Sequence, residues 1–108
     1  MPKIDPAEVE KLVLSLGAIG AHSGTGVCRT AFSPEWMAAQ AMVRRWADDA
    51  GLATSFDAAG NLWARAEGAE PGPAYVTGSH IDSQLTGGRY DGALGVIAGF
   101  VALASLIK

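Results

Sequence analysis

The sequence is poor in cysteine and in basic clusters. Its 108 residues include a single cysteine, Cys28, so no disulfide can form within one chain. The absence of a disulfide framework favours a reducing compartment. Eight Lys and Arg against eleven Asp and Glu give a net charge of −3, and the basic residues do not cluster. Binding to nucleic acid or to an anionic membrane surface therefore has no electrostatic support.

A long hydrophobic run is also missing. The longest, residues 93–107, is interrupted by Gly95, Gly99 and Ser105. It is shorter than the ~18 residues that indicate a membrane-spanning helix, and no basic, apolar leader opens the chain. We therefore expect a cytoplasmic protein without membrane association. Apolar residues make up 49% of the chain, which excludes a disordered protein, and the length favours one domain.

Capping signals predict two amphipathic helices. Asp5-Pro6 predicts a helix that stops at Gly17, and Ser33-Pro34 predicts one that stops at Gly51. Their apolar stripes at helical spacing are Val9, Leu12, Val13 and Leu16 in the first helix, and Trp36, Ala39, Val43, Trp46 and Ala50 in the second. The predicted solvated face of the second helix contains Gln40, Arg44, Arg45, Asp48 and Asp49.

Between these helices, residues 17–33 contain four glycines and are predicted to be irregular. A loop of this length is often functional. His22 is interpreted as a surface histidine, with a position near an active-site mouth as the alternative. Cys28 is interpreted as a small buried hydrophobe.

The second half of the chain predicts strands and a final helix. Residues 52–57 and 61–66 are expected to form a hairpin, and residues 74–78 a further strand. Gly92, Gly95, Gly99 and Ala102 share one face of the final helix, which predicts close packing against that further strand. This order of elements predicts an α/β fold, a layered domain with a mixed sheet flanked by helices.

The chemistry-bearing residues lie at the end of this expected strand. In an extended segment, His80 and Asp82 point to the same side. Asp91 precedes the final helix and is either its cap or a carboxylate that reaches back to His80. Imidazole plus carboxylate suits zinc, manganese, cobalt or nickel. A phosphate site in the Gly87-Gly88 turn is the weaker alternative, because the turn lacks the Gly-Lys-Ser/Thr pattern of a nucleotide loop.

Residues 78–96 (GSHIDSQLTGGRYDGALGV) closely resemble the metal-binding segment of a dinuclear-metal amidohydrolase family. That family contains N-carbamoyl-L-amino-acid hydrolases, allantoate amidohydrolases and β-ureidopropionases. The resemblance extends to residues 24–35 (GTGVCRTAFSPE) and 57–65 (DAAGNLWAR), and so covers most of the chain. Leu85 stands where the carbamoylase branch often has proline, a departure that affects only loop stiffness.

The resemblance implies that His80 binds one metal ion, that Asp91 bridges two, and that Asp82 orients His80. It implies two divalent ions (Zn, Mn, Co or Ni), a small ureido or amide substrate whose C–N bond is hydrolysed, and a homodimer for the full-length protein. It also implies the fold of a zinc-peptidase-like catalytic domain.

The residues that would complete this site are not in the sequence. After Asp91 the chain has no Glu, Asp, His or Cys, whereas the family's general base and remaining ligands lie downstream. We therefore expect residues 1–108 to be the N-terminal portion of the catalytic domain, inactive alone, without the dimerisation domain or the C-terminal half. The alternatives are a non-catalytic or partner-binding fragment and, among enzymes, an aminoacylase or metallopeptidase.

Overall fold

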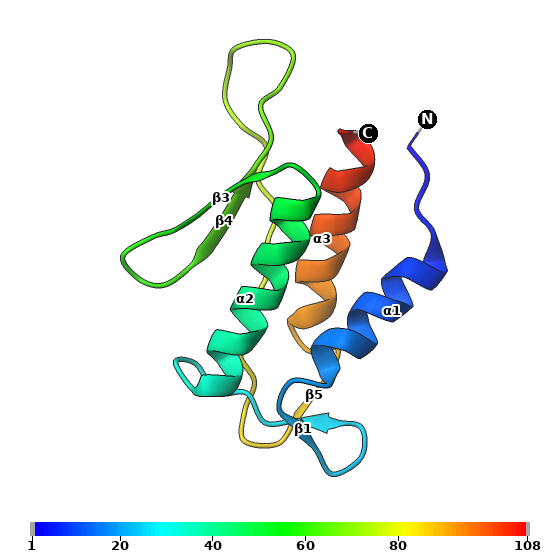
Figure 1. Cartoon of the computed structure of the whole chain (residues 1–108), viewed down its shortest axis with the longest axis vertical. Helices are drawn as coiled ribbons and strands as arrows, with labels where there is room; N and C mark the ends of the chain where they lie inside the picture. Colours follow the sequence, from blue (N-terminus) through cyan, green and yellow to red (C-terminus); the bar gives the residue numbers. More distant parts are fainter. Residues whose placement is uncertain (1, 108) are drawn as a thin grey trace.

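The computed structural model describes residues 2–107. They form an α/β arrangement of helices and small antiparallel sheets, in which α3 lies between α1 and α2 (Figure 1). This confirms the predicted fold class. In chain order the elements are α1 (Pro6–Gly17), β1 (Ala21–His22), β2 (Gly26–Val27), α2 (Pro34–Asp49), β3 (Ala53–Phe56), β4 (Leu62–Arg65), β5 (Gly87–Gly88) and α3 (Ala93–Leu106).

The first two helices begin where their capping residues predict. The Asp5 carboxylate accepts a hydrogen bond from the backbone N–H of Ala7 at 3.0 Å, and the Ser33 hydroxyl accepts one from Trp36 at 3.1 Å. Each bond satisfies a donor that the first helical turn leaves without a partner. Gly51 follows α2 with φ of +85°, a conformation that favours glycine.

The segment predicted to be irregular contains two short strands, which corrects that expectation. β1 pairs with β2, and β2 pairs with β5, both antiparallel, in the order β1-β2-β5. The reversal between β1 and β2 uses positive φ at Ser23 and Gly24. Strands of two residues are too short to show the alternation by which a strand is recognised in a sequence.

The predicted hairpin is confirmed as β3 and β4, paired antiparallel with Phe56 opposite Leu62. Every strand pair in residues 2–107 is antiparallel, so the sheets described there are not the mixed sheet that was expected. The further strand expected at residues 74–78 is not present, because this segment pairs with no other strand among the described residues. A groove of about 440 Å³ separates residues 76–82 from β4, so the two backbones do not meet as neighbouring strands do.

The core lies where α1, α2 and α3 meet around Ile81. Its buried members are Val13, Leu16, Ala39, Val43, Ile81, Ala93, Ile97 and Val101. Gln40 was expected on the solvated face but is buried, where its amide nitrogen donates a 2.9 Å hydrogen bond to Gly60 O. This bond offsets the cost of burying a polar group. Of the described helices, none has the length and apolar character that crossing a bilayer demands.

The glycine face of α3 packs closely against residues 77–79, as predicted. A Cβ added at Gly95 would lie 2.8 Å from the Cβ of Ser79, and one at Gly99 would lie 3.0 Å from the Thr77 methyl group. The helix therefore lies so close to the residues that precede His80 that only glycine fits on this face.

Candidate metal-binding wall

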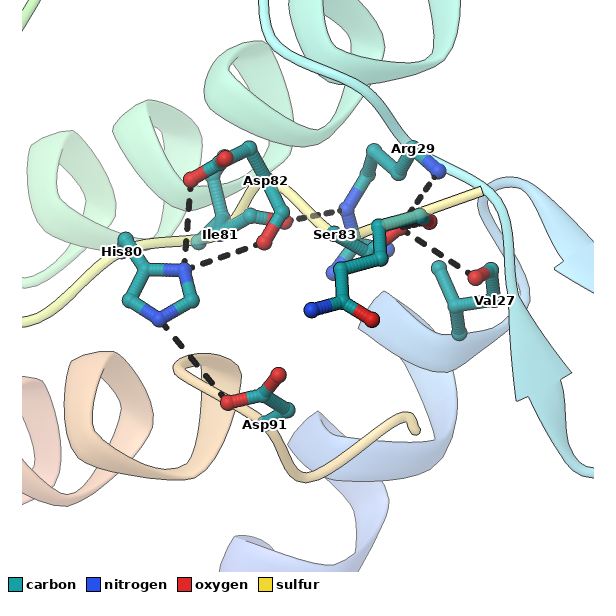
Figure 2. Close-up of polar contacts among 8 residues, drawn as sticks. Val27, Arg29, His80, Ile81, Asp82, Ser83 and Asp91 are labelled. Atoms are coloured by element: carbon teal, nitrogen blue, oxygen red, sulfur yellow. Dashed lines mark hydrogen bonds and ion pairs between the residues drawn. The ribbon is translucent and has the colours of Figure 1, made fainter. Parts of the chain in front are cut away.

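His80 lies between two carboxylates, one from its own segment and one from the start of α3 (Figure 2). Its Nδ1 is 3.2 Å from Asp82 Oδ1 and 3.0 Å from the Asp82 backbone oxygen. Its Nε2 is 3.9 Å from Asp91 Oδ1. The structure thus brings together the three residues selected from the sequence. All three side chains are about half exposed, so the cluster is open to solvent and to ligands.

This geometry selects one form of the neutral imidazole. Both oxygens next to Nδ1 belong to Asp82, and a carbonyl or an ionised carboxylate can only accept a hydrogen bond. Nδ1 therefore carries the proton and donates it to Asp82. The lone pair of the neutral ring is then on Nε2, the nitrogen that faces Asp91. A metal-binding histidine commonly has this arrangement, with a carboxylate or carbonyl holding its other nitrogen.

Asp91 does not cap α3, so that alternative is wrong. The N-cap of α3 is Gly92, with φ of +73° and no side-chain cap hydrogen bond. A Cβ at Gly92 would collide with the ring and the backbone oxygen of His80. Glycine at this position lets the start of α3 approach His80, and the Asp91 carboxylate is thereby left to face the ring.

The alternative phosphate cradle gains no support. Gly87 and Gly88 form β5, in register with Val27 and Gly26 of β2. Their backbone is therefore engaged in a sheet rather than arranged around an anion.

Two residues that the sequence did not single out, Arg29 and Ser83, hold the segment that carries His80 and Asp82. Arg29 is 2% exposed, and its guanidinium donates to Ile81 O at 2.7 Å. Ser83 lies beside it, with its backbone N–H 2.8 Å from Arg29 O. Burial lowers the pKa of Arg29 below its ordinary value, and the negative charge of Asp82 opposes this shift. Neither residue belongs to a local pattern, since the contacts of Arg29 with Ile81 and Ser83 join positions more than 50 residues apart.

The other two candidates lie outside the cluster. His22 is exposed on β1, which confirms the surface interpretation. Cys28 is half-buried with a free thiol, rather than fully buried as expected.

The side chains of the cluster are of the right kind to bind a divalent metal ion, but there are too few of them. Neutral imidazole and carboxylate are suitable donors for zinc and related ions. Within residues 2–107, however, no group of three or more His, Cys, Asp or Glu side chains is placed to hold an ion. His80 and Asp91 provide two ligands, and a catalytic zinc site usually has three from the protein.

Known proteins resemble this chain in sequence. No family model matches it. Allantoate amidohydrolase from Bacillus subtilis is 45% identical over 92 residues, which cover 84% of this chain and 22% of the relative. N-carbamoyl-L-amino-acid amidohydrolase from a Pseudomonas species is 46% identical over 85 residues, 78% of this chain and 20% of the relative.

Solved structures agree with this relationship. A hydantoinase/carbamoylase family amidase from Burkholderia ambifaria superposes on 99% of this chain with a TM-score of 0.92 and 38% identity. A second, from Burkholderia phymatum, has a TM-score of 0.88 and 40% identity over 98%. This chain covers 27% and 26% of those two chains, and it spans about a fifth of the sequence relatives. Across this shared region, the chain is homologous in sequence and similar in fold to allantoate amidohydrolases, N-carbamoyl-L-amino-acid amidohydrolases and hydantoinase/carbamoylase amidases.

Proposed function

We propose that this chain forms one side of the active site of a metal-dependent amidohydrolase. We call this side, which carries His80, Asp82 and Asp91, the metal-binding wall. The substrate class is a carbamoyl, ureido or linear amide compound of the N-carbamoyl-L-amino acid or allantoate type, and the reaction is hydrolysis of its C–N bond. The observation that carries this proposal is the contact of His80 with Asp82 and Asp91 inside a region shared with amidohydrolases.

In this proposal, His80 Nε2 and the Asp91 carboxylate are metal ligands. Asp82 is a positioning residue that holds the proton on Nδ1 and fixes the ring. Divalent ions bound here (Zn, Mn, Co or Ni, two in the complete site) would polarise the substrate carbonyl and acidify a bound water. The general base is not among the described residues of the cluster, so the 108-residue chain alone is expected to be inactive. A cytoplasmic location and a homodimer of the complete enzyme belong to the same proposal.

Zinc titration by calorimetry tests the ligand assignment. We expect His80→Ala and Asp91→Ala to abolish metal binding in a full-length version of the protein, because each removes a metal ligand. His22→Ala is the matched control, since it removes the other histidine, on the exposed strand β1. Retained stoichiometry in both ligand variants would contradict the assignment. Turnover of a ureido substrate by this chain, with two metal ions bound, would contradict the proposal that the site is partial.

A different role, docking of a partner, is favoured by one observation. Tyr75 and Val76 are exposed next to the groove that separates residues 76–82 from β4. Exposed apolar side chains beside a groove are typical of a surface that another polypeptide covers.

Aminoacylase or peptidase activity is the alternative within the enzyme class, and a panel of ureido, acyl and peptide substrates on a full-length relative separates these activities.

A further inference from the structure

Arg29 has an unusual environment for a cation. It is 2% exposed, and its hydrogen-bond acceptors are backbone carbonyl groups rather than carboxylates. Nη1 donates to Leu16 O and to Ile19 O, each at 2.8 Å, and Nε donates to Ile81 O at 2.7 Å. Burying a charge is costly unless it is compensated, so this arrangement requires an explanation.

The end of α1 provides part of the compensation. The last carbonyl groups of a helix lack partners within the helix and form the negative end of its dipole. α1 has no basic residue in its own last turn. Arg29, which follows β2 in the chain, supplies that cation. It donates to Leu16 O, one of the last carbonyls of α1, and to Ile19 O just after the helix. The guanidinium is therefore fixed against α1 on one side.

On its other side the same guanidinium holds the segment of the candidate ligands. Ile81 is the residue between His80 and Asp82, and its side chain is buried in the core. The bond from Nε to Ile81 O fixes the peptide plane that joins Ile81 to Asp82. Figure 2 shows Arg29 and the imidazole of His80 on opposite sides of Asp82.

The backbone of Arg29 strengthens the attachment. Its N–H donates to the Ser83 hydroxyl at 2.7 Å, and its carbonyl accepts from the Ser83 N–H at 2.8 Å. The Ser83 hydroxyl is also 3.2 Å from Val27 O. Residues 81 and 83 are therefore both attached to Arg29, and Asp82 lies between two fixed points. Side-chain and backbone contacts together leave this segment little freedom to rotate.

We infer that Arg29 is the positioning residue of this wall: it attaches residues 81–83 to the end of α1 and so fixes the Asp82 oxygens that orient His80. The hydrogen bonds of Arg29 go to Ile81, Ser83 and the end of α1 rather than to His80, so it acts through Ile81 and Ser83. The inference rests on the proposed function, since the segment positioned carries the proposed ligands. Lysine cannot replace arginine in this role, because its single nitrogen cannot reach three acceptors from the fixed directions of a planar guanidinium.

The test compares Arg29→Lys with Arg44→Lys. Arg44 is a partly exposed arginine of α2 that contacts Thr54 and Asp48, and its variant is the matched control. The first measurement is the ring-nitrogen NMR spectrum of His80, at a pH where the ring is neutral. His22, exposed on β1, serves as the internal reference. The second measurement is zinc affinity, determined below the unfolding temperature of every variant.

We expect the wild type and Arg44→Lys to show a His80 ring with its proton on Nδ1. In Arg29→Lys the ring should move toward the tautomer mixture shown by His22, and zinc affinity should fall about 10-fold or more, as for other residues that orient ligands. A purely structural role would lower the unfolding temperature and leave both readouts unchanged in the folded protein, and that outcome overturns the inference.

Ser83→Ala keeps the test decisive if Arg29→Lys does not fold. It removes one hydroxyl from the same attachment and leaves the guanidinium in place, so we expect a smaller shift in the same direction. An unchanged His80 tautomer in Ser83→Ala would then overturn the inference. The tautomer measurement needs no metal. If a full-length version binds no metal ion, the metal-site proposal fails, while the tautomer result still decides the role of Arg29.

Discussion

Asp57 shows how one exposed carboxylate orders the turn between β3 and β4. Its Oδ1 accepts from the backbone N–H groups of Ala59 at 3.0 Å and Asn61 at 2.9 Å. Its Oδ2 accepts from the Asn61 amide and the Trp63 indole, both at 3.0 Å. These donors favour the ionised form, those of Trp63 and Asn61 most, and lower the pKa of Asp57 from 3.8 to about 2. Its role is structural, because its oxygens are engaged within the turn.

This shift predicts a specific acid sensitivity. A carboxyl group whose pKa is lower in the folded state stabilises the fold above its unfolded pKa, 3.8. That stabilisation disappears as the pH falls to about 2. Asp57→Asn should therefore lower the unfolding temperature near neutral pH and have a diminishing effect through this window. Thermal unfolding followed by circular dichroism at several pH values measures it. A difference between wild type and variant that stays constant from neutral pH to pH 2 would contradict the assignment.

At the scale of elements, α3 depends on its contact with residues 77–79, just before His80. Gly95 and Gly99 are unfavourable within a helix by about 1 kcal/mol each relative to alanine. These glycines allow Ser79 and Thr77 to pack against the helix, because atoms of those two residues occupy the space that a Cβ would take. The helix therefore accepts a lower intrinsic stability in order to lie directly behind the candidate ligands.

Gly95→Ala tests this contact. Although alanine favours a helix, we expect the variant to lose about 1–3 kcal/mol of unfolding free energy, typical of overpacking. The clash is with the Cβ of Ser79, at 2.8 Å, which cannot move without its backbone. In a double-mutant cycle with Ser79→Gly, measured by urea unfolding, the two substitutions should partly compensate. Additive effects, or a more stable Gly95→Ala, would show that the packing is looser than described.

The whole molecule exposes more surface than its mass predicts. Its accessible area is 7101 Å², whereas a compact monomer of 11.1 kDa has about 5,700 Å². Its radius of gyration is 14.2 Å, against about 13 Å for a compact domain of this length. Part of the excess is apolar, as shown by the exposed side chains of Tyr75, Val76, Leu106 and Ile107.

We therefore predict that the isolated chain self-associates as its concentration rises. Burial of exposed apolar surface drives such association. Sedimentation velocity over a wide concentration range measures it, and the double variant Tyr75→Ser/Val76→Ser should remain monomeric to higher concentration. Met37→Ser is the control, because Met37 is exposed on α2 and does not line the groove next to Tyr75 and Val76. A monomer at all concentrations would contradict the prediction.

The features that the sequence predicts are those decided by neighbouring residues. Asp5-Pro6 and Ser33-Pro34 set the starts of two helices because a cap acts within three residues. The contact of His80 with Asp82 follows from the alternation of side chains in an extended segment.

Tertiary contacts decide what the sequence does not reveal. Gln40 lies at a position typical of a solvated helix face, but Gly60 O accepts its amide hydrogen. Arg29 has partners in α1 and in residues 81–83, and no local pattern marks it as the residue that joins these two segments. The expected strand at residues 74–78 needed a neighbouring strand, and within the described residues it has none.

The attachment of residues 81–83 to residues 27–29 has a consequence for the order of folding. Its hydrogen bonds join positions 52 to 56 residues apart, whereas β3 and β4 are joined by a short turn. Closing a longer loop costs more entropy, so local elements have the advantage early. We predict φ-values near zero for Ser83→Ala and clearly higher values for substitutions in the β3–β4 hairpin, measured by stopped-flow kinetics. High values at Ser83 would reverse this order. This order would orient the candidate ligands in the last steps of folding, after the helices and hairpin that surround them have formed.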